Sequence, residues 1–403
     1  MAVRHGYGKV AGADALVFAY DTGDARNSYK GEPTTNLLPA GVAATHDAAS
    51  GNAVTVTDAT NEKGPGWKKV TITARGTNFR TLQWTYITMT ANIMYCHSAV
   101  FDWGNMRGKN YFIYFDGTGT GTRTYYYPEN YSTPGDVNIN SSMPNGKFAG
   151  TITHTDSHLH AFFIGNYTTS TSGLNDYFYY KEFQVEVNSH PTQYTTGTRS
   201  STQGLLDLTG NSTINLANVS FDSNARKVFD GTDDLMSITA DGITDYSQPF
   251  TMECVFKVDS GATWDNGYRS NIFGIAGSYA GMYGLYKNNN SGVGIQVRDA
   301  TTTAYAIVSS GLSKGVYYHL VGTWDGTSQL SLYLNGELAQ NTTATMTGAP
   351  DTPNLYIGGL RAYGGAGGNY YQGEIPVAKY YRKALTADEV RNNYRHYKTR
   401  FDI

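Results

Sequence analysis

The most constraining feature of this sequence is a stretch of twenty-three residues, 316–338, that encodes three strands and two turns. Residues 318–324 are β-branched, aromatic or small, which predicts one strand. From Leu330 to Leu334 leucines alternate with other residues, which predicts a second strand with one face toward a core. Asp325-Gly326 and Asn335-Gly336 tolerate the positive φ angles of tight turns. The stretch therefore predicts an antiparallel meander.

Length and composition exclude several classes of protein. The chain has 403 residues, a formal net charge of −3 and no run of Lys or Arg, so we expect no nucleic-acid partner. No apolar stretch approaches the roughly 18 residues of a membrane span, and residues 1–5 lack the apolar core of a signal peptide. We therefore expect a protein made in a cytosol, with no membrane insertion. Cys96 and Cys254 lie far apart in the sequence, so we expect buried thiols rather than a disulfide or a metal site.

Short strand patterns separated by turn residues continue along the rest of the chain, which predicts an all-β protein. A strand at 13–20 is followed by a turn-rich segment that ends at Gly31. Further strands are expected at 53–57, 67–73, 84–90, 111–115, 160–164, 177–187, 250–258, 283–286, 294–298 and 354–358.

The end of the chain carries the signals of a short helix. Thr386 and Glu389 have the spacing of a capping box, and Leu385 and Val390 occupy the positions of a hydrophobic staple. Apolar and aromatic residues recur at helical spacing from Val390 to Phe401. A C-terminal helix is therefore expected after the last strand.

Several phrases of the sequence resemble known families. The pattern W-D-G-x-x-x-L-x-L-Y-L-N-G-E at 324–337, with 204–211 and 228–238, resembles laminin-G-like, concanavalin-A-like lectin sandwiches. Residues 13–31 and 393–401 resemble the opening and close of tailed-phage virion proteins that carry such a sandwich. Residues 183–200 resemble the last strand and exit of carbohydrate-binding-module-like jelly rolls in phage structural proteins. The resemblance implies two β-sandwich (jelly-roll) domains.

The order of these phrases predicts the domain organisation. Residues 1–32 hold the opening strand, 33–198 the carbohydrate-binding-module-like jelly roll, and 199–403 the laminin-G-like domain with its short helix. Because the opening strand and its continuation flank the jelly roll, we expect the jelly roll to be inserted and the first strand to complete the C-terminal sandwich. The alternative is a free N-terminal arm that anchors to a neighbouring subunit.

The sequence offers few candidates for catalytic residues. Glu182 and Glu186 fall on one face of a strand by its two-residue period, but about 13 Å apart, beyond the ≈ 5–9.5 Å of glycosidase carboxylates. His154, His158 and His160 with Asp156 suggest zinc, but no Cys or Glu completes the set, and a polar loop is the favoured interpretation. We find no G-x-S-x-G or phosphate-binding loop. We therefore expect no enzymatic activity.

Two sets of loop residues could bind a ligand. The carboxylates of Asp230, Asp233 and Asp234 could hold Ca²⁺, as in some laminin-G-like domains, although Asp230 and Asp233 are more simply explained as turn formers. Aromatic and amide side chains in loops could contact either a sugar or another subunit. These residues are Tyr126 and Tyr131 in the jelly roll, and Trp264, Asn266, Tyr268, Tyr279, Tyr283, Tyr363, Asn369, Tyr370 and Tyr371 in the lectin-like half.

The resemblance implies a virion surface protein of a tailed phage, acting as a fibre, tail or capsid decoration. Its partners would be other virion proteins and host cell-surface glycans, and it would be a homo-oligomer made in the host cytoplasm. Many copies would multiply weak glycan contacts. The alternatives are a structural cement or assembly protein with no glycan binding, and a polysaccharide depolymerase that uses Glu182 and Glu186.

Overall fold

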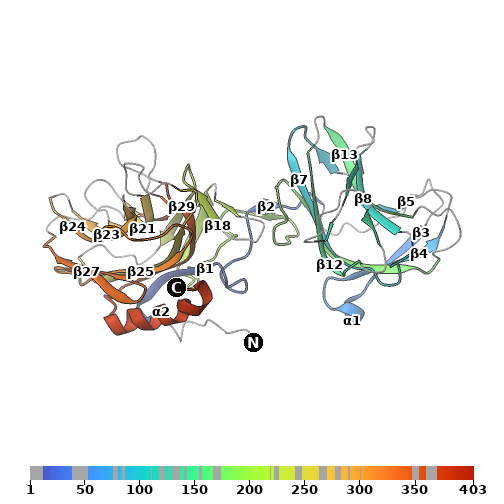
Figure 1. Ribbon diagram of the computed structural model, residues 1–403. Coiled ribbons are helices and arrows are strands. Elements are labelled where there is room, and N and C mark those ends of the chain that lie inside the picture. The colour runs from blue at the N-terminus through green and yellow to red at the C-terminus, as the bar shows by residue number, and fades with distance from the viewer. Residues whose placement is uncertain are drawn as a thin grey trace. The chain divides into compact units, whose positions relative to one another are not determined.

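The computed structural model describes residues 12–38, 53–75, 80–83, 87–109, 111–117, 123–125, 127–128, 137–139, 143–153, 157–166, 174–217, 219–221, 227–240, 247–262, 270–276, 283–288, 291–299, 301–346, 354–359 and 370–403. The chain divides into two compact units. Unit 1 comprises Met1–Pro33 and Ser200–Ile403, and unit 2 comprises Thr34–Arg199 (Figure 1). Unit 2 is therefore an insertion into the sequence of unit 1.

Unit 1 contains two antiparallel sheets. The first has the order β17-β18-β29-β20-β25-β26-β27, with β1 also paired to β29. Its strands are β1 (Leu16–Asp21), β17 (Ser220–Phe221), β18 (Lys227–Asp230), β20 (Phe250–Val258), β25 (Tyr317–Trp324), β26 (Gln329–Leu334), β27 (Glu337–Thr343) and β29 (Gln372–Tyr381). The second has the order β16-β19-β28-β21-β22-β23-β24. Its strands are β16 (Ser212–Ala217), β19 (Leu235–Ala240), β21 (Ser270–Ala276), β22 (Tyr283–Asn288), β23 (Gly292–Arg298), β24 (Thr303–Val308) and β28 (Asn354–Ile357).

The predicted meander is confirmed as β25, β26 and β27. Trp324 pairs with Leu330 across the first hairpin, and Leu330 and Leu332 are fully buried. Asp325 ends β25 because its Oδ1 accepts bonds from the backbone N–H groups of residues 327, 328 and 329. Asn335 and Gly336 have φ angles of 50° and 81°, as a two-residue hairpin turn requires.

Aromatic contacts join the two sheets of unit 1 into one core. Phe18 of β1 lies 6.2 Å from Phe273 of β21, measured between ring centroids. Phe250 of β20 lies 4.6 Å from Tyr283 of β22. Tyr20 is also buried, and its hydroxyl donates to the carbonyl of Ile375 at 2.7 Å. The N-terminal strand is therefore part of the core of unit 1.

The central strand β29 was not among the expected strands. It lies between β18 and β20 and also pairs with β1. It contains Pro376, which cannot donate a ladder hydrogen bond and usually argues against a central strand. The pairing of β29 with β20 shifts register between Val255 and Lys257, next to Pro376. The irregularity in the ladder accommodates the proline.

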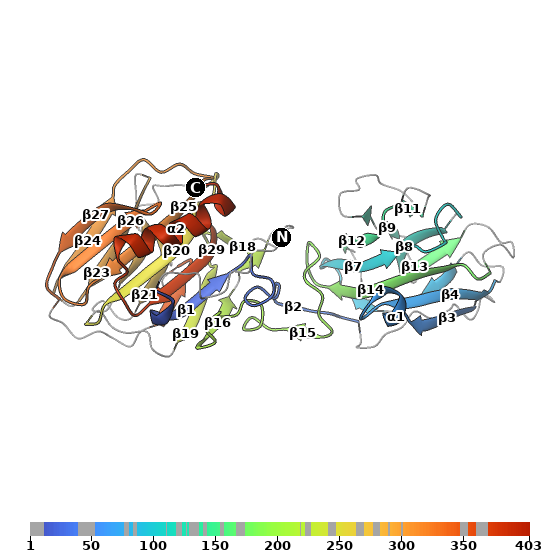
Figure 2. The same ribbon diagram turned by 90° about the horizontal axis from the view of Figure 1, so that it is seen from below.

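Helix α2 (Ala387–Phe401) packs on the first sheet of unit 1 and has the predicted capping box at Thr386 and Glu389 (Figure 2). Beneath it Glu253 of β20 is fully buried, with Oε1 3.1 Å from His319 Nε2 and 3.7 Å from Lys379 Nζ. Glu253 Oε2 accepts bonds from the Tyr381 hydroxyl at 2.8 Å and from Asn393 Nδ2 at 2.9 Å. A buried polar network therefore joins three strands to the helix.

No helix in the described part of the chain is long and apolar enough to cross a membrane.

Unit 2 is a second sandwich with its own core. One sheet has the order β10-β12-β7-β14-β4-β3, and the other β11-β8-β13-β5, with β6 on β13 and β9 on β8. The strands are β3 (Ala53–Asp58), β4 (Lys68–Ala74), β5 (Arg80–Gln83), β6 (Ile87–Met89), β7 (Met94–Asp102), β8 (Tyr111–Gly117), β9 (Arg123–Tyr125), β10 (Tyr127–Pro128), β11 (Val137–Asn138), β12 (Gly146–Thr153), β13 (His158–Asn166) and β14 (Tyr177–Glu186). The short helix α1 (Thr60–Lys63) precedes β4. Its core includes the stacked rings of Phe101 and Trp103, whose centroids lie 4.6 Å apart.

The fold class is confirmed: both units are β-sandwiches, with one short C-terminal helix. Cys96 and Cys254 are both buried and free, as expected. Burial raises the pKa of both thiols well above the ordinary value. The short strands β2 (Thr34–Thr35) and β15 (Thr198–Arg199) pair with each other where the chain enters and leaves unit 2.

Candidate functional site

The acidic turn, Asp230 to Asp234, joins β18 to β19 in unit 1. Asp230 Oδ1 accepts the backbone N–H of Thr232 at 2.7 Å, and Gly231 takes a φ of 84°. Asp234 Oδ2 in turn accepts the backbone N–H of Asp230 at 2.8 Å. The turn-former interpretation is therefore correct for Asp230, and Asp234 closes the turn.

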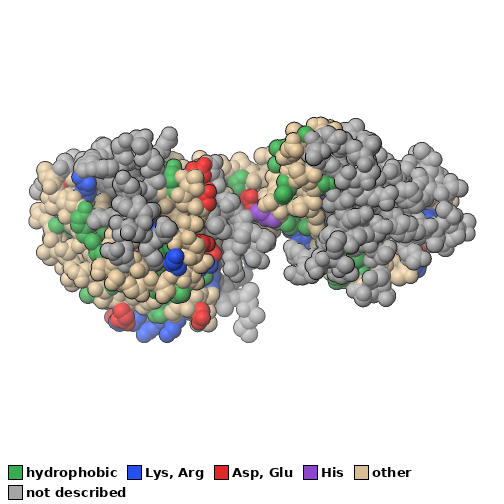
Figure 3. All heavy atoms as spheres, turned by 45° about the horizontal axis from the view of Figure 1, so that its top comes forward, with side chains coloured by type: hydrophobic (Ala, Val, Ile, Leu, Met, Phe, Trp, Pro, Cys, Tyr) green, Lys and Arg blue, Asp and Glu red, His purple; other side chains and the backbone are tan. Residues whose placement is uncertain are grey.

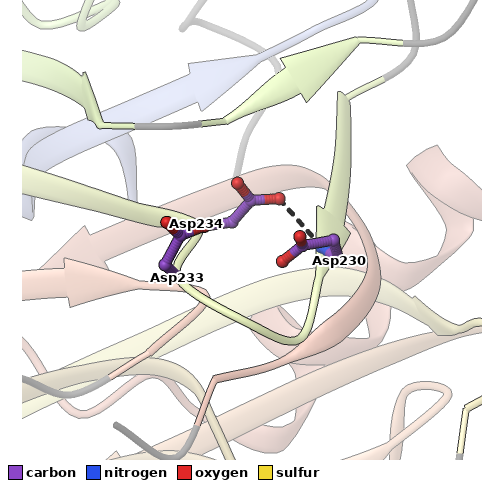
Figure 4. Close-up of side chains that lie close together, drawn as sticks. All are labelled: Asp230, Asp233 and Asp234. Atoms are coloured by element: carbon purple, nitrogen blue, oxygen red, sulfur yellow. Dashed lines mark hydrogen bonds between the residues drawn. The ribbon is translucent and has the colours of Figure 1, made fainter. Parts of the chain in front are cut away.

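The three carboxylates of the acidic turn also lie close enough to share a cation. One oxygen from each of Asp230, Asp233 and Asp234 lies within 4.8 Å of the others (Figure 4). Asp230 and Asp233 are exposed, whereas Asp234 is 2% exposed. Burial, together with the neighbouring charges of Asp230 and Asp233, raises the pKa of Asp234 to about 6. Oxygen ligands of this kind suit Ca²⁺, which would relieve the repulsion among them.

Tyr370 is half-buried and lies near Leu235, the residue that directly follows the acidic turn. A Cβ atom on Gly359 would lie 2.9 Å from Tyr370 Cδ1 and 3.2 Å from Leu235 Cδ1, so both side chains pack on this glycine. Asp230 pairs with Gln372 in the ladder between β18 and β29. The fold thus brings together one predicted aromatic residue and the predicted acidic cluster, which are about 140 residues apart in the sequence.

Acidic side chains are grouped at the surface of unit 1 near β18 in the space-filling view (Figure 3). Elsewhere on this face the described charged side chains are mixed in sign. Carboxylates accept hydrogen bonds from hydroxyls, and the half-buried Tyr370, near Leu235 at the end of the turn, has an aromatic ring with apolar faces. The arrangement is suited to bind a cation or a hydroxyl-rich ligand.

Two of the predicted aromatic residues belong to the core. Tyr283 is 1% exposed and Tyr371 is fully buried, both within the core of unit 1. The prediction that they bind a surface ligand is therefore wrong, because neither ring has an accessible face. Tyr283 packs on Phe250, and Tyr371 lies 6.2 Å from Phe229.

Other predicted residues lie outside the described part of the chain. They are Tyr126, Tyr131, Trp264, Asn266, Tyr268, Tyr279, Tyr363 and Asn369, and also His154 and Asp156. His158 and His160 belong to strand β13.

The prediction that Glu182 and Glu186 share one face of a strand is wrong. Glu182 has a φ of 55° and lies in a bulge of β14, where the register with β7 shifts between Lys181 and Gln184. The extra residue reverses the alternation of side chains. Glu182 is exposed, whereas Glu186 is fully buried and accepts bonds from the backbone N–H and hydroxyl of Thr192 and the hydroxyl of Thr34. Glu186 therefore has a structural role.

Comparison with known proteins identifies part of unit 1. Residues 230–391 match the model of a family described as the concanavalin A-like lectin/glucanases superfamily. No curated protein matches the sequence. The binding domain of botulinum neurotoxin serotype D is 13% identical, with a TM-score of 0.38, over 48% of this chain and 49% of that chain. The receptor-binding domain of the C/D mosaic neurotoxin is 14% identical, with a TM-score of 0.40, over 48% of this chain and 49% of that chain.

Each of these alignments spans about half the length of the neurotoxin domain. The family match covers the acidic turn from Asp230 onward, the meander, and β29. The two-sheet topology of unit 1 agrees with that match. Residues 230–391 of unit 1 are therefore similar to the concanavalin A-like lectin/glucanases superfamily.

Proposed function

We propose that this protein is a non-catalytic adhesin whose concanavalin A-like domain binds glycans. The observation that carries the proposal is the acidic turn beside the half-buried Tyr370 on this domain. Carboxylates accept hydrogen bonds from sugar hydroxyls, and a tyrosine ring packs against the CH face of a sugar. In this proposal Ca²⁺, held by Asp230, Asp233 and Asp234, strengthens binding by bridging carboxylates and hydroxyls.

The setting that we propose is the surface of a tailed-phage virion, as a fibre, tail or capsid decoration. Support comes from the sequence phrases at 13–31, 183–200 and 393–401. The partners would be other virion proteins and host cell-surface glycans, and the protein would be a homo-oligomer. Several weak sites on one particle raise the effective concentration of the second contact, so that modest affinity suffices for adhesion.

A glycan array probed with the full-length protein tests the proposal. We expect binding that falls about fivefold in Asp233→Asn and in Tyr370→Ala, because each loses a hydrogen bond or a packing contact worth about 1 kcal/mol. Asp388→Asn, on the exposed face of α2, and Tyr194→Ala, in unit 2, are the matched controls and should bind as the unaltered protein does. A chelator should weaken binding if Ca²⁺ contributes.

The first alternative is a structural cement. Absence of binding to every glycan, with retained binding to purified virion particles that lack the protein, would favour it. The second alternative is a polysaccharide depolymerase. Glu182→Gln and Glu186→Gln should then abolish cleavage of host capsule, although the opposite placement of these side chains argues against a catalytic pair.

A further inference from the structure

A hollow in the surface of unit 1 lies where its first strand begins. It has a volume of about 720 Å³ and is lined by three separate stretches of the chain. Residues 14–17 precede and begin β1, Gly210 and Asn211 precede β16, and Arg382 directly follows β29. We call it the strand-start pocket. Pockets of roughly 300–1,000 Å³ are the size in which proteins bind small ligands.

The lining of the strand-start pocket combines three planar polar side chains with an apolar wall. Asp14 contributes a carboxylate that accepts hydrogen bonds, Arg382 a guanidinium that donates them, and Asn211 an amide that does both. Leu16 and Val17 supply the wall, and each packs against a buried hydrophobic cluster. Adjacent hydroxyls on a sugar ring offer the complementary donors and acceptors, and the ring also has apolar CH groups.

One side of the strand-start pocket is fixed by a hydrogen-bonded turn. Asp207 is 8% exposed, and its Oδ2 accepts the backbone N–H groups of Asn211 at 3.1 Å and Ser212 at 3.0 Å. The hydroxyl of Thr209 lies within hydrogen-bonding distance of both Asp207 Oδ2, at 2.6 Å, and the carbonyl oxygen of Val17, at 2.9 Å. The turn that carries Asn211 is therefore joined directly to β1.

The other side is fixed by backbone pairing. The N–H of Arg382 donates to the carbonyl of Ala15 at 2.8 Å, and the N–H of Ala15 donates to the carbonyl of Gly12 at 2.9 Å. Asp14 lies within the short 3-10 helix Ala13–Ala15. Since the backbone on both sides is held before a ligand arrives, the conformational entropy lost on binding is confined to the side chains.

We propose that the strand-start pocket is a glycan subsite that holds one or two sugar units through Asp14, Asn211 and Arg382. This inference rests on the proposed glycan-binding function and names a site for it separate from the acidic turn. The subsite is assembled only when residues 14–17 occupy their place in unit 1, so the first strand contributes to recognition as well as to the core.

Substitution of the polar lining tests the proposal in the full-length protein. Using the glycan that binds best on the array, we expect Asn211→Ala and Arg382→Ala each to weaken binding about tenfold, from the loss of hydrogen bonds. Asn341→Ala, on exposed β27, and Arg395→Ala, on exposed α2, are the matched controls and should bind as the unaltered protein does. Thermal unfolding should be unchanged in all four.

A second variant blocks the pocket with a bulky group. Because Cys96 and Cys254 are buried, a thiol introduced by Asn211→Cys can be labelled selectively with a bulky maleimide. Labelling should abolish binding of that glycan, whereas labelling of Asn341→Cys should leave it intact.

The outcomes separate this inference from the function on which it rests. Loss of binding in the Asn211 and Arg382 variants and in the labelled Asn211→Cys protein supports the subsite. Unchanged binding in all of them, with loss in Tyr370→Ala, overturns the subsite and leaves glycan binding at the acidic turn. Absence of glycan binding by the unaltered protein overturns both.

Discussion

At the scale of single residues, the buried carboxylate of Glu253 makes the sharpest prediction about stability. Burial alone would raise its pKa, but Lys379, His319 and Tyr381 lower the pKa to about 2, so Glu253 is ionised at neutral pH. Glu253→Gln leaves Lys379 buried without its partner charge. Removing one member of a buried ion pair costs about 3–5 kcal/mol, and we expect a loss of that order in the free energy of unfolding.

Urea titration of Glu253→Gln, followed by circular dichroism, measures this loss. The matched control is Glu337→Gln, which breaks an exposed pair with Arg391 and should change stability little. Equal effects of the two substitutions would contradict a special role for the buried network.

Asp234 should make stability depend on pH in the opposite sense from most carboxylates. Its pKa in the folded protein is raised to about 6, so the folded state binds this proton more tightly than the unfolded state does. Its contribution to stability is therefore gained as pH falls from about 6 toward about 4 and is lost as pH rises through 6. Urea midpoints at pH 4.5, 5.5 and 7 should show this dependence in the difference between the unaltered protein and Asp234→Asn.

The decisive result is which of the two proteins, the unaltered protein or Asp234→Asn, is the more stable at pH 7. Asp234→Asn should be the more stable protein at pH 7, because it removes one of three neighbouring charges while its amide oxygen can still accept the N–H of Asp230. A variant that is less stable at pH 7 would show that the carboxylate is compensated, as a tightly held cation would do.

The kinds of residue found in loops were a better guide to the chemistry of the candidate site than to which individual residues form it. The acidic cluster was identified from D-G-T-D-D because turn chemistry is local. Tyr371 could not be distinguished from Tyr370, since only the tertiary placement of the segment before β29 decides which of two adjacent tyrosines enters the core. The pocket formed by Asp14, Asn211 and Arg382 has no local signal, because its members meet only through tertiary structure.

At the scale of elements, strand β29 depends on a close backbone approach at Gly373. The φ of Gly373 is 147°, and an added Cβ would lie 2.1 Å from the carbonyl oxygen of Lys257. Gly373→Ala should therefore destabilise unit 1 by more than Gly315→Ala, which also has a positive φ but no atom within 4 Å of the added Cβ.

Differential scanning calorimetry on both glycine variants measures the comparison. Gly315→Ala should cost about 1–2 kcal/mol from backbone strain alone. A cost no larger at Gly373 would mean that β29 can move away from β20 without penalty.

The strands and the helix were predictable where the sequence carried local turn or capping signals. The meander and helix α2 follow from Asn335-Gly336 and from the capping box at Thr386. Strand β29 escaped prediction because Pro376 lies inside it, and the irregular pairing with β20 that accommodates proline leaves no mark in the sequence. The bulge at Glu182 likewise has no signal in the sequence, so the faces predicted for the residues after it in β14 were reversed.

At the scale of the whole molecule, the two units have separate cores, so core substitutions should act on one unit at a time. Phe18→Ala removes a fully buried ring from unit 1, and Phe101→Ala removes one from unit 2. Each should cost about 3–5 kcal/mol in its own unit. Calorimetry should show two transitions, of which each variant lowers a different one. A shift of both transitions by either variant would mean that the units unfold together.

The pairing of β2 with β15 has a consequence for how such a chain can be rearranged. Because residues 34–35 and 198–199 run side by side, the chain leaves and rejoins unit 1 through adjacent positions. Such a junction tolerates exchange of the intervening segment, since any cassette with neighbouring ends can be spliced there without redirecting β1. The junction is therefore a suitable place to exchange unit 2 for another domain while unit 1 stays unchanged.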